Sequence, residues 1–247
     1  MLKERQKEIM ALLKEKGKVS VDELASKLYV SEATIRRNLV ELKSLGLIER
    51  AHGLALLADH SEEISIFVRI SKNAHEKEKA VSNVIPHLPE FQSVFIDGSS
   101  TALALAQRID LSHKTVVTYG VQTTVALSKK EDINLILLGG NVQPNTVSAT
   151  GSWTVRQLNE FSFDLMICSC TAVEDDMVLE RTMEQKEIKH AAFMRSKHKI
   201  LIVDHFKFGR SGIHRFANLG DFDIVATDCP PPKELLGRNI NFVYGAK

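Results

Sequence analysis

The sequence has few of the residues that stabilise secreted or metal-rich proteins, with three cysteines and one tryptophan in 247 residues. Cys168, Cys170 and Cys229 lack the spacing of a disulfide framework or a zinc motif, so we expect ordinary thiols and no metal site. No apolar run is long enough to span a membrane, and the chain opens on a charged helical pattern instead of an apolar leader. These absences favour a cytoplasmic protein that makes no membrane contact.

The net charge is also small, but its distribution is uneven. The total is +1, and 44% of the residues are hydrophobic, which leaves room for two cores. Residues 1–57 carry 11 Lys and Arg against 8 Asp and Glu, whereas residues 58–247 carry 21 against 23. We therefore expect a mildly basic domain over 1–57, a polar linker over 58–70 and a second domain over 71–247.

Two helices and a hairpin are predicted in the basic part. Ser20 and Glu23 have the spacing of a capping box at the start of a short helix. Tyr29 and Val30 form a turn, and Ser31 is a favourable N-cap for a second helix. In that helix Ile35, Leu39 and Leu42 recur at helical spacing and face the core, so Arg37 points directly outward.

This pattern is typical of a helix-turn-helix that reads the major groove of double-stranded DNA. Residues 47–56 add a hairpin with a basic tip, which suits a wing lying along the DNA backbone. The alternative is a plain helical hairpin with solvated arginines. The expected DNA contacts are Tyr29, Ser31, Ala33, Thr34, Arg36, Arg37, Lys43, Arg50 and His52.

The stretch SEATIRRNLVELKSLGLIERAHG resembles the signature of the DeoR family of bacterial transcriptional regulators. It departs from the family at Asn38, where Asp is usual, and at Leu54, where a second Gly is usual. Asn38 lies beside the inward face, so its effect is expected on packing more than on DNA reading. The resemblance implies a winged helix-turn-helix transcriptional regulator, usually a repressor.

From residue 91 onward, short apolar runs alternate with helical stretches. The runs lack polar alternation, which indicates strands covered on both faces. They lie at 93–98, 115–120, 133–140, 163–168, 199–204, 222–228 and 240–245. Helices are expected near 101–109, 121–129, 152–160 and 184–196. This order predicts an α/β fold with a Rossmann-like parallel sheet, whose ligands bind at the carboxyl ends of the strands.

Several strand-end segments are candidates for a phosphate site. The loop that opens the helix at 101 offers backbone amides and hydroxyls, although its Ser and Thr also suit simple capping. Glycines at 139–140 allow close approach of a ligand or simply form a turn. Lys189 and Lys207 could supply a positive charge, although a position on the protein surface would explain both lysines equally well. The candidate effector residues are Asp97, Gly98, Ser99, Ser100, Thr101, Thr118, Tyr119, Gly139, Gly140, Lys189 and Lys207.

This half again resembles the DeoR family, whose sensor domain is similar to the fold of ribose phosphate isomerase. The matching positions are Asp97, Gly98, Ser100, Thr101, Gly139, Gly140, Asp204, Lys207, Gly209, Thr227 and Asp228. Ser99 and Tyr119-Gly120 depart from the family pattern. The resemblance implies a phosphorylated sugar or polyol as effector, self-association into a dimer or tetramer, and no cofactor.

Two other functions remain open on the sequence. An isomerase or deaminase with a DNA-binding head would need a carboxylate base, which Glu174, Asp175 or Asp176 could supply. A domain that only oligomerises is the third possibility. Loop acids are usually surface charges, so we expect a regulator and not an enzyme.

Overall fold

The computed structural model describes residues 3–45, 47–51, 53–57 and 64–245. The chain forms two compact units, Met1–Lys72 and Asn73–Lys247, and each is described by itself. Within the described residues, no helix is both long and apolar enough to cross a membrane.

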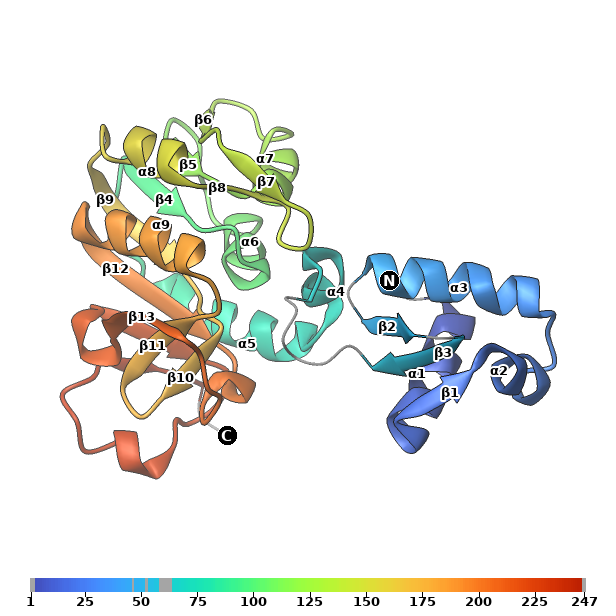
Figure 1. Ribbon diagram of the computed structural model, residues 1–247. Helices are drawn as coiled ribbons and strands as arrows, with labels where there is room; N and C mark the ends of the chain where they lie inside the picture. Colours follow the sequence, from blue (N-terminus) through green and yellow to red (C-terminus); the bar gives the residue numbers. More distant parts are fainter. Residues whose placement is uncertain (1–2, 46, 52, 58–63, 246–247) are drawn as a thin grey trace. The chain divides into compact units, whose positions relative to one another are not determined.

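The first unit combines helices with a small antiparallel sheet (Figure 1). Its strands are arranged in the order β1-β3-β2. Ile9, Leu24, Ile35 and Leu39 are fully buried in its core. Its elements are α1 Glu4–Lys16, β1 Lys18–Ser20, α2 Val21–Lys27, α3 Glu32–Ser44, β2 Ile48–Ala51, β3 Leu54–Leu57 and α4 Ile66–Ser71.

The ends of these helices have local causes in the sequence. Gly17 ends α1 with a φ of 76°, a conformation that glycine adopts without steric cost. The Ser20 hydroxyl accepts a hydrogen bond from the Glu23 amide at 3.1 Å. The other half of the predicted capping box is wrong, because the Glu23 carboxylate pairs with Lys16 instead.

The predicted linker, residues 58–70, overlaps a helix. Its first six residues, 58–63, lie outside the described residues. Residues 66–71 form α4, whose Ile66 is buried. The boundary between the two compact units falls after this helix, at Lys72.

The second unit is built on seven parallel strands in the order β15-β14-β12-β9-β4-β5-β6. These are the seven strands predicted from the apolar runs. Their bounds are β4 Ser93–Ile96, β5 Thr115–Thr118, β6 Asn134–Leu137, β9 Phe163–Cys168, β12 Ser196–Val203, β14 Ile224–Thr227 and β15 Phe242–Val243.

Helices cover both faces of this sheet (Figure 1). Val94 and Ile96 of β4 face a core shared with α5 and α6, whereas Phe95 faces the opposite core, shared with α8 and α9. Burial on both faces explains why the strands lack polar alternation. The helices are α5 Ala74–Val84, α6 Ser100–Ala106, α7 Val121–Leu127, α8 Ser152–Leu158 and α9 Met183–Met194, with 3-10 turns η1 Ile85–His87, η2 His205–Lys207, η3 Leu219–Asp221 and η4 Lys233–Leu235.

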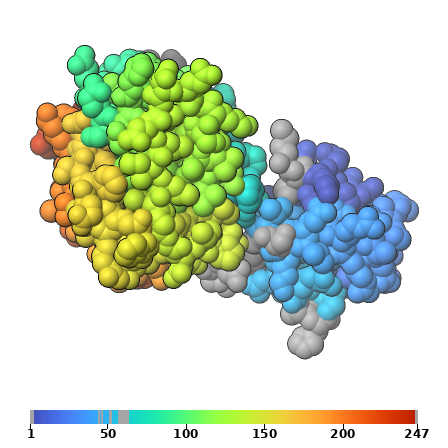
Figure 2. Space-filling model, turned by 90° about the horizontal axis from the view of Figure 1, so that it is seen from above, coloured from blue at the N-terminus to red at the C-terminus, as the bar shows by residue number. Residues whose placement is uncertain are grey.

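Two small antiparallel sheets were not predicted from the sequence. One pairs β7 Asn141–Gln143 with β8 Ser148–Thr150, and the other joins β10 Ala172–Glu174, β11 Met177–Glu180 and β13 His214–Asn218. The segment around β6 and β7 lies at the surface, yellow-green in Figure 2, with Leu137 and Val142 exposed. The second small sheet matters for the site, because β11 ends in Glu180.

Candidate nucleic-acid interface and effector site

Helix α3 has the inward face that the sequence predicted. The Ser31 hydroxyl accepts a hydrogen bond from the Thr34 amide at 3.3 Å, so Ser31 caps the helix. Ile35, Leu39 and Leu42 are all fully buried. Asn38 is also buried, and its side-chain amide donates to the Thr34 carbonyl at 2.8 Å. Asn38 therefore belongs to the packing of the helix.

The outward side of α3 carries the predicted DNA-contact residues. Arg36 and Arg37 are exposed, and Arg36 donates to the Glu32 carboxylate one turn earlier at 2.7 Å. Tyr29 is 94% exposed at the turn before α3 and has a φ of 51°. The other exposed residues of this group are Ser31, Ala33 and Lys43, and Thr34 is half-buried. This side of the helix can donate hydrogen bonds to a ligand outside the protein.

The predicted wing is an antiparallel hairpin of β2 and β3, with Ile48 paired to Leu57. Arg50 lies on β2 and is half-buried. His52, the other predicted wing contact, lies outside the described residues. Gly53 turns the chain with a φ of 83°.

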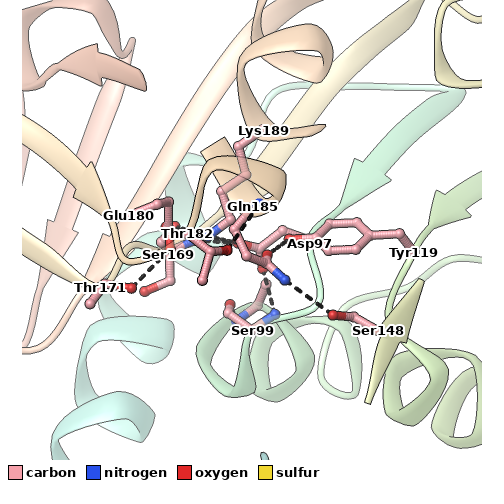
Figure 3. A network of polar contacts seen from close by, with 11 residues as sticks. Asp97, Ser99, Tyr119, Ser148, Ser169, Thr171, Glu180, Thr182, Gln185 and Lys189 are labelled. Carbon is pink, nitrogen blue, oxygen red and sulfur yellow. Dashed lines mark hydrogen bonds and ion pairs between the residues drawn. The ribbon is translucent and has the colours of Figure 1, made fainter. Parts of the chain in front are cut away.

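A buried ion cluster lies at the carboxyl ends of the strands in the second unit (Figure 3). The Lys189 ammonium is 2.9 Å from the Asp97 carboxylate and 2.6 Å from the Glu180 carboxylate. It also donates to the Ser169 carbonyl at 2.8 Å. All three ammonium hydrogens thus have an acceptor. The surface position that the sequence allowed for Lys189 is wrong, because the residue is only 3% exposed.

This arrangement keeps Lys189 charged. Burial alone would lower the pKa of Lys189, but the Asp97 and Glu180 carboxylates outweigh it and hold that pKa well above its ordinary value. Further donors hold the carboxylates, since the Ser169 amide donates to Asp97 at 3.0 Å and the Thr171 hydroxyl to Glu180 at 2.9 Å.

Asp97 also shapes the predicted phosphate loop. Its Oδ1 accepts a hydrogen bond from the Ser99 amide at 2.9 Å, and the Ser99 hydroxyl accepts one from the Ala102 amide at 3.1 Å. Ser99 is therefore the N-cap of α6 and is engaged within the protein. Ser100 and Thr101 occupy the first two helical positions, whose amides have no acceptor within a helix.

Tyr119 lies against this loop in a chain of side-chain hydrogen bonds (Figure 3). Its hydroxyl donates to the Gln185 carbonyl oxygen at 2.7 Å, and the Gln185 amide donates to the Ser148 hydroxyl at 3.1 Å. The Tyr119 ring is completely buried and stacks on Phe95 at a centroid distance of 5.9 Å. Burial raises the pKa of Tyr119 well above its ordinary value, so its hydroxyl remains a donor.

The remaining candidate effector residues are Thr118, Gly139, Gly140 and Lys207, and each makes different contacts. The Thr118 hydroxyl accepts from the Gly120 amide at 3.1 Å. A Cβ on Gly140 would lie 2.1 Å from the Thr154 hydroxyl, so this glycine permits close packing of the protein on itself. The Gly139 carbonyl likewise accepts from Thr154 at 2.8 Å. Lys207 is half-buried in η2, three residues after the buried acid Asp204.

Sequence reasoning missed several members of the buried cluster. Glu180 follows an apolar run and Gln185 lies on a helical face, but neither has a motif of its own. The acids considered for an enzyme were Glu174, Asp175 and Asp176, whereas the acids that pair with Lys189 are Asp97 and Glu180. Asp176 instead lies 3.7 Å from Arg238. The acid–lysine pairing therefore uses Asp97 and Glu180.

Comparison with known proteins identifies both halves of the chain. The family described as "DeoR-like helix-turn-helix domain" matches residues 5–61, and "DeoR C terminal sensor domain" matches residues 72–229. The glycerol-3-phosphate regulon repressor of Escherichia coli is 33% identical over 94% of this chain and 93% of its own length. The regulator GolR of Listeria innocua is 31% identical, over 91% of this chain and 90% of its own.

The comparison also includes a more distant relative and a solved structure. The repressor GlcR of Bacillus subtilis is 26% identical over 96% of this chain and 93% of its own length. Ribose 5-phosphate isomerase A of Neisseria gonorrhoeae has a TM-score of 0.38 and 16% identity, over 53% of this chain and 52% of that chain, which is too low to support a conclusion. The relatives over nearly the full length are regulators and not enzymes. The chain belongs to the DeoR family of DNA-binding transcriptional regulators.

Proposed function

We propose that the protein represses genes of sugar or polyol metabolism by binding an operator through α3 and the wing. The main support is the exposed side of α3, where Arg37 lies opposite the buried Ile35 and Arg36 lies on the flank of that outer face. Arginine forks on the outer face of such a helix suit base edges and phosphates in the major groove. The cytoplasm is the expected location, because operator DNA is the target.

A phosphorylated sugar or polyol is the proposed effector. Relatives are named for the glycerol-3-phosphate regulon and for a lactose phosphotransferase system. In this chain the effector phosphate would lie on the amides and hydroxyls of Ser100 and Thr101, with Lys207 as counter-charge. Ser99, which was also expected there, has its amide and hydroxyl bonded within the protein. Asp97 and Lys189 would act indirectly, because their contacts hold the loop in shape.

The domain roles follow from this assignment. Residues 1–57 would bind DNA, residues 58–70 would connect, and residues 71–247 would sense the effector. Self-association into a dimer or tetramer would place two α3 helices on two half-sites, as helix-turn-helix regulators usually require.

Selection of DNA from a random duplex library by the full-length chain tests the proposal. Fluorescence anisotropy then measures the affinity of the selected duplex while glycerol 3-phosphate, glucose 6-phosphate, fructose 1-phosphate and inorganic phosphate are added in turn. We expect a recurrent DNA sequence and at least one phosphate ester that changes its affinity. Recovery of no preferred sequence would overturn the DNA-binding role. A preferred sequence whose affinity no phosphate ester changes would overturn the effector role alone.

A further inference from the structure

A second cluster of polar side chains lies near η2, and it is separate from the DNA-binding helix and from the Lys189 cluster. It consists of His205, Asp228 and Cys229. His205 follows β12, whereas Asp228 and Cys229 follow β14. These strands are parallel neighbours, and Val203 is paired with Thr227 near their ends. The topology of the sheet therefore brings the three residues together, although 23 residues separate His205 from Asp228 in the sequence.

The three side chains offer a nitrogen, an oxygen and a sulfur within one small volume. One ligand atom from each lies within 4.8 Å of the others. The closest pair is His205 Nδ1 and Asp228 Oδ2, at 2.7 Å. Among the described residues, this is the one group of three or more His, Cys, Asp and Glu side chains with such spacing.

Backbone contacts hold both loops in place. The His205 amide donates to Asp228 Oδ1 at 2.7 Å, which fixes the carboxylate independently of the imidazole. The Thr227 hydroxyl donates to the Cys229 carbonyl, which ties the turn that carries the thiol. The Asp228 side chain is 5% exposed and the His205 side chain is 42% exposed. The carboxylate is thus already positioned, and the imidazole beside it is exposed to solvent.

We propose that His205, Asp228 and Cys229 bind a divalent transition-metal ion, with Zn²⁺ as the preferred ion. Imidazole nitrogen, carboxylate oxygen and thiolate sulfur are the usual zinc ligands, and three protein ligands leave a fourth position for water or another small ligand. A set with one thiolate and one imidazole disfavours Mg²⁺ and Ca²⁺, which prefer oxygen ligands. The proposal departs from the expectation of ordinary thiols and no metal site. Its ligands come from two strand ends that are distant in the sequence, so no spacing motif marks them.

The ion would replace the hydrogen bond between His205 and Asp228. Ligand atoms about 2.1 Å from a tetrahedral zinc lie roughly 3.3 Å apart, so the imidazole must move away from the carboxylate by a fraction of an ångström. Rotation of the exposed His205 ring provides this movement. Binding also releases the thiol proton, so the affinity falls as the pH falls. The inference does not depend on the effector, although Lys207 lies only two residues beyond His205.

The first test uses thiol protection in the unmodified full-length chain after removal of bound metal. Cys168 and Cys170 are buried, whereas Cys229 is partly exposed, so a thiol reagent such as DTNB should label Cys229 in the native protein. One equivalent of Zn²⁺ per chain is expected to slow that labelling by about tenfold or more. Labelling of Cys229 at an unchanged rate with saturating Zn²⁺ would overturn the proposal.

The second test identifies the ligands with Co²⁺ as a spectroscopic probe and competition by Zn²⁺. The native chain should give a sulfur-to-cobalt charge-transfer band that Cys229→Ser abolishes. His205→Asn should weaken Zn²⁺ binding by about tenfold or more, whereas His87→Asn, which alters an exposed histidine elsewhere, should leave it unchanged. A band that survives in Cys229→Ser, or equal Zn²⁺ affinity in His205→Asn and His87→Asn, would contradict the assignment.

Discussion

At the scale of single residues, Lys189 is a buried cation in the sensor domain whose ammonium group has three acceptors. Its three acceptors are Asp97, Glu180 and the Ser169 carbonyl. A buried charge is tolerated only when partners replace its lost hydration, and these three do so. The cluster therefore fixes the loop at Asp97 to the helix α9 that carries Lys189.

We predict that Lys189→Met lowers the free energy of unfolding by about 3–5 kcal/mol, because it leaves two carboxylates buried without their cation. Urea denaturation of the full chain measures this loss. Lys186→Met, on the same helix and half-buried, is the matched control and should change stability by no more than about 0.5 kcal/mol. Equal losses in the two variants would mean that the ion cluster adds nothing specific.

We also predict that stability falls above pH 9 because of the buried thiols. Burial raises the pKa of Cys170 from 9.0 to about 12. The unfolded thiol ionises first, so the stabilising contribution is complete below about pH 9 and is lost as the pH rises toward 12. Each such thiol costs about 1.4 kcal/mol per pH unit in that range.

Cys170→Ala isolates this effect. Free energies of unfolding are compared for the native chain and the variant at pH 8 and pH 10. The native chain should lose about 1.4 kcal/mol more than the variant over this interval. Parallel pH profiles would show that Cys170 ionises equally easily in the folded protein.

The contacts of a single residue could be predicted from the sequence only where its partners lie close to it in the chain. Ser31 was predicted as an N-cap from the local pattern, and it is one. Ser99 was expected to contact the effector, with capping as the alternative, and it is the N-cap of α6. Glu180 was not predicted as a site residue. It lies on a short strand of a small sheet that has no strong sequence pattern, and its partners are Thr171 and Lys189. Tyr119 was expected beside a ligand, but its environment depends on Gln185 of a distant helix.

At the scale of elements, helix α3 combines a buried face with a charged outer side. The inward positions followed from helical periodicity, because Ile35, Leu39 and Leu42 recur every three or four residues. The ion pair of Arg36 with Glu32 was not predicted. It holds the Arg36 guanidinium along the helix.

We predict that Arg37→Ala costs about 1–3 kcal/mol of specific DNA affinity and relaxes preference at one base pair, because Arg37 points outward from the start of the recognition helix. Arg36→Ala should weaken specific and random duplexes alike and reduce the salt slope by about one. Anisotropy titrations at several salt concentrations separate the two. Sequence-independent losses for both variants would show that a different face reads the bases.

We predict that Arg50→Ala in β2 of the wing lowers affinity for specific and random DNA together, because the hairpin is expected to contact phosphates or the minor groove. The same titrations and a footprint measure this change. Lys18→Ala, on the neighbouring sheet strand β1, serves as a control for a general loss of positive charge. An Arg50→Ala affinity equal to that of the native chain would exclude DNA contact by this side chain.

At the scale of the whole chain, the sequence predicted the parallel sheet better than the small sheets. The apolar runs identify the strands because the central strands, such as β4 and β9, are buried on both faces. The edge strands β6 and β15 are only partly buried, but they still read as apolar runs. The short strands β7, β8 and β10 have three residues each, so they contain too little periodicity to distinguish them from loops. Glu180 ends β11, which pairs with β10 in one of the small sheets. The ion cluster of Lys189 with Asp97 and Glu180 could therefore not be predicted without that sheet.

Effector control requires that two separate units be coupled. The proposed phosphate site lies in the second unit, whereas α3 lies in the first. An effector changes operator affinity only if it binds the DNA-competent and incompetent arrangements with different affinities. The coupling is reciprocal, so operator DNA must change effector affinity by the same factor.

The most direct measurement is therefore the operator affinity of the full chain with and without its phosphorylated effector, for the native chain, Thr101→Val and Lys207→Ala. We predict a change of about 5- to 150-fold in the native chain, which corresponds to about 1–3 kcal/mol of coupling. Both variants should lose this response and keep their basal operator affinity, because one lacks a hydroxyl of the phosphate loop and the other lacks the counter-charge. A native response that persists in both variants at the same effector concentration would contradict the account.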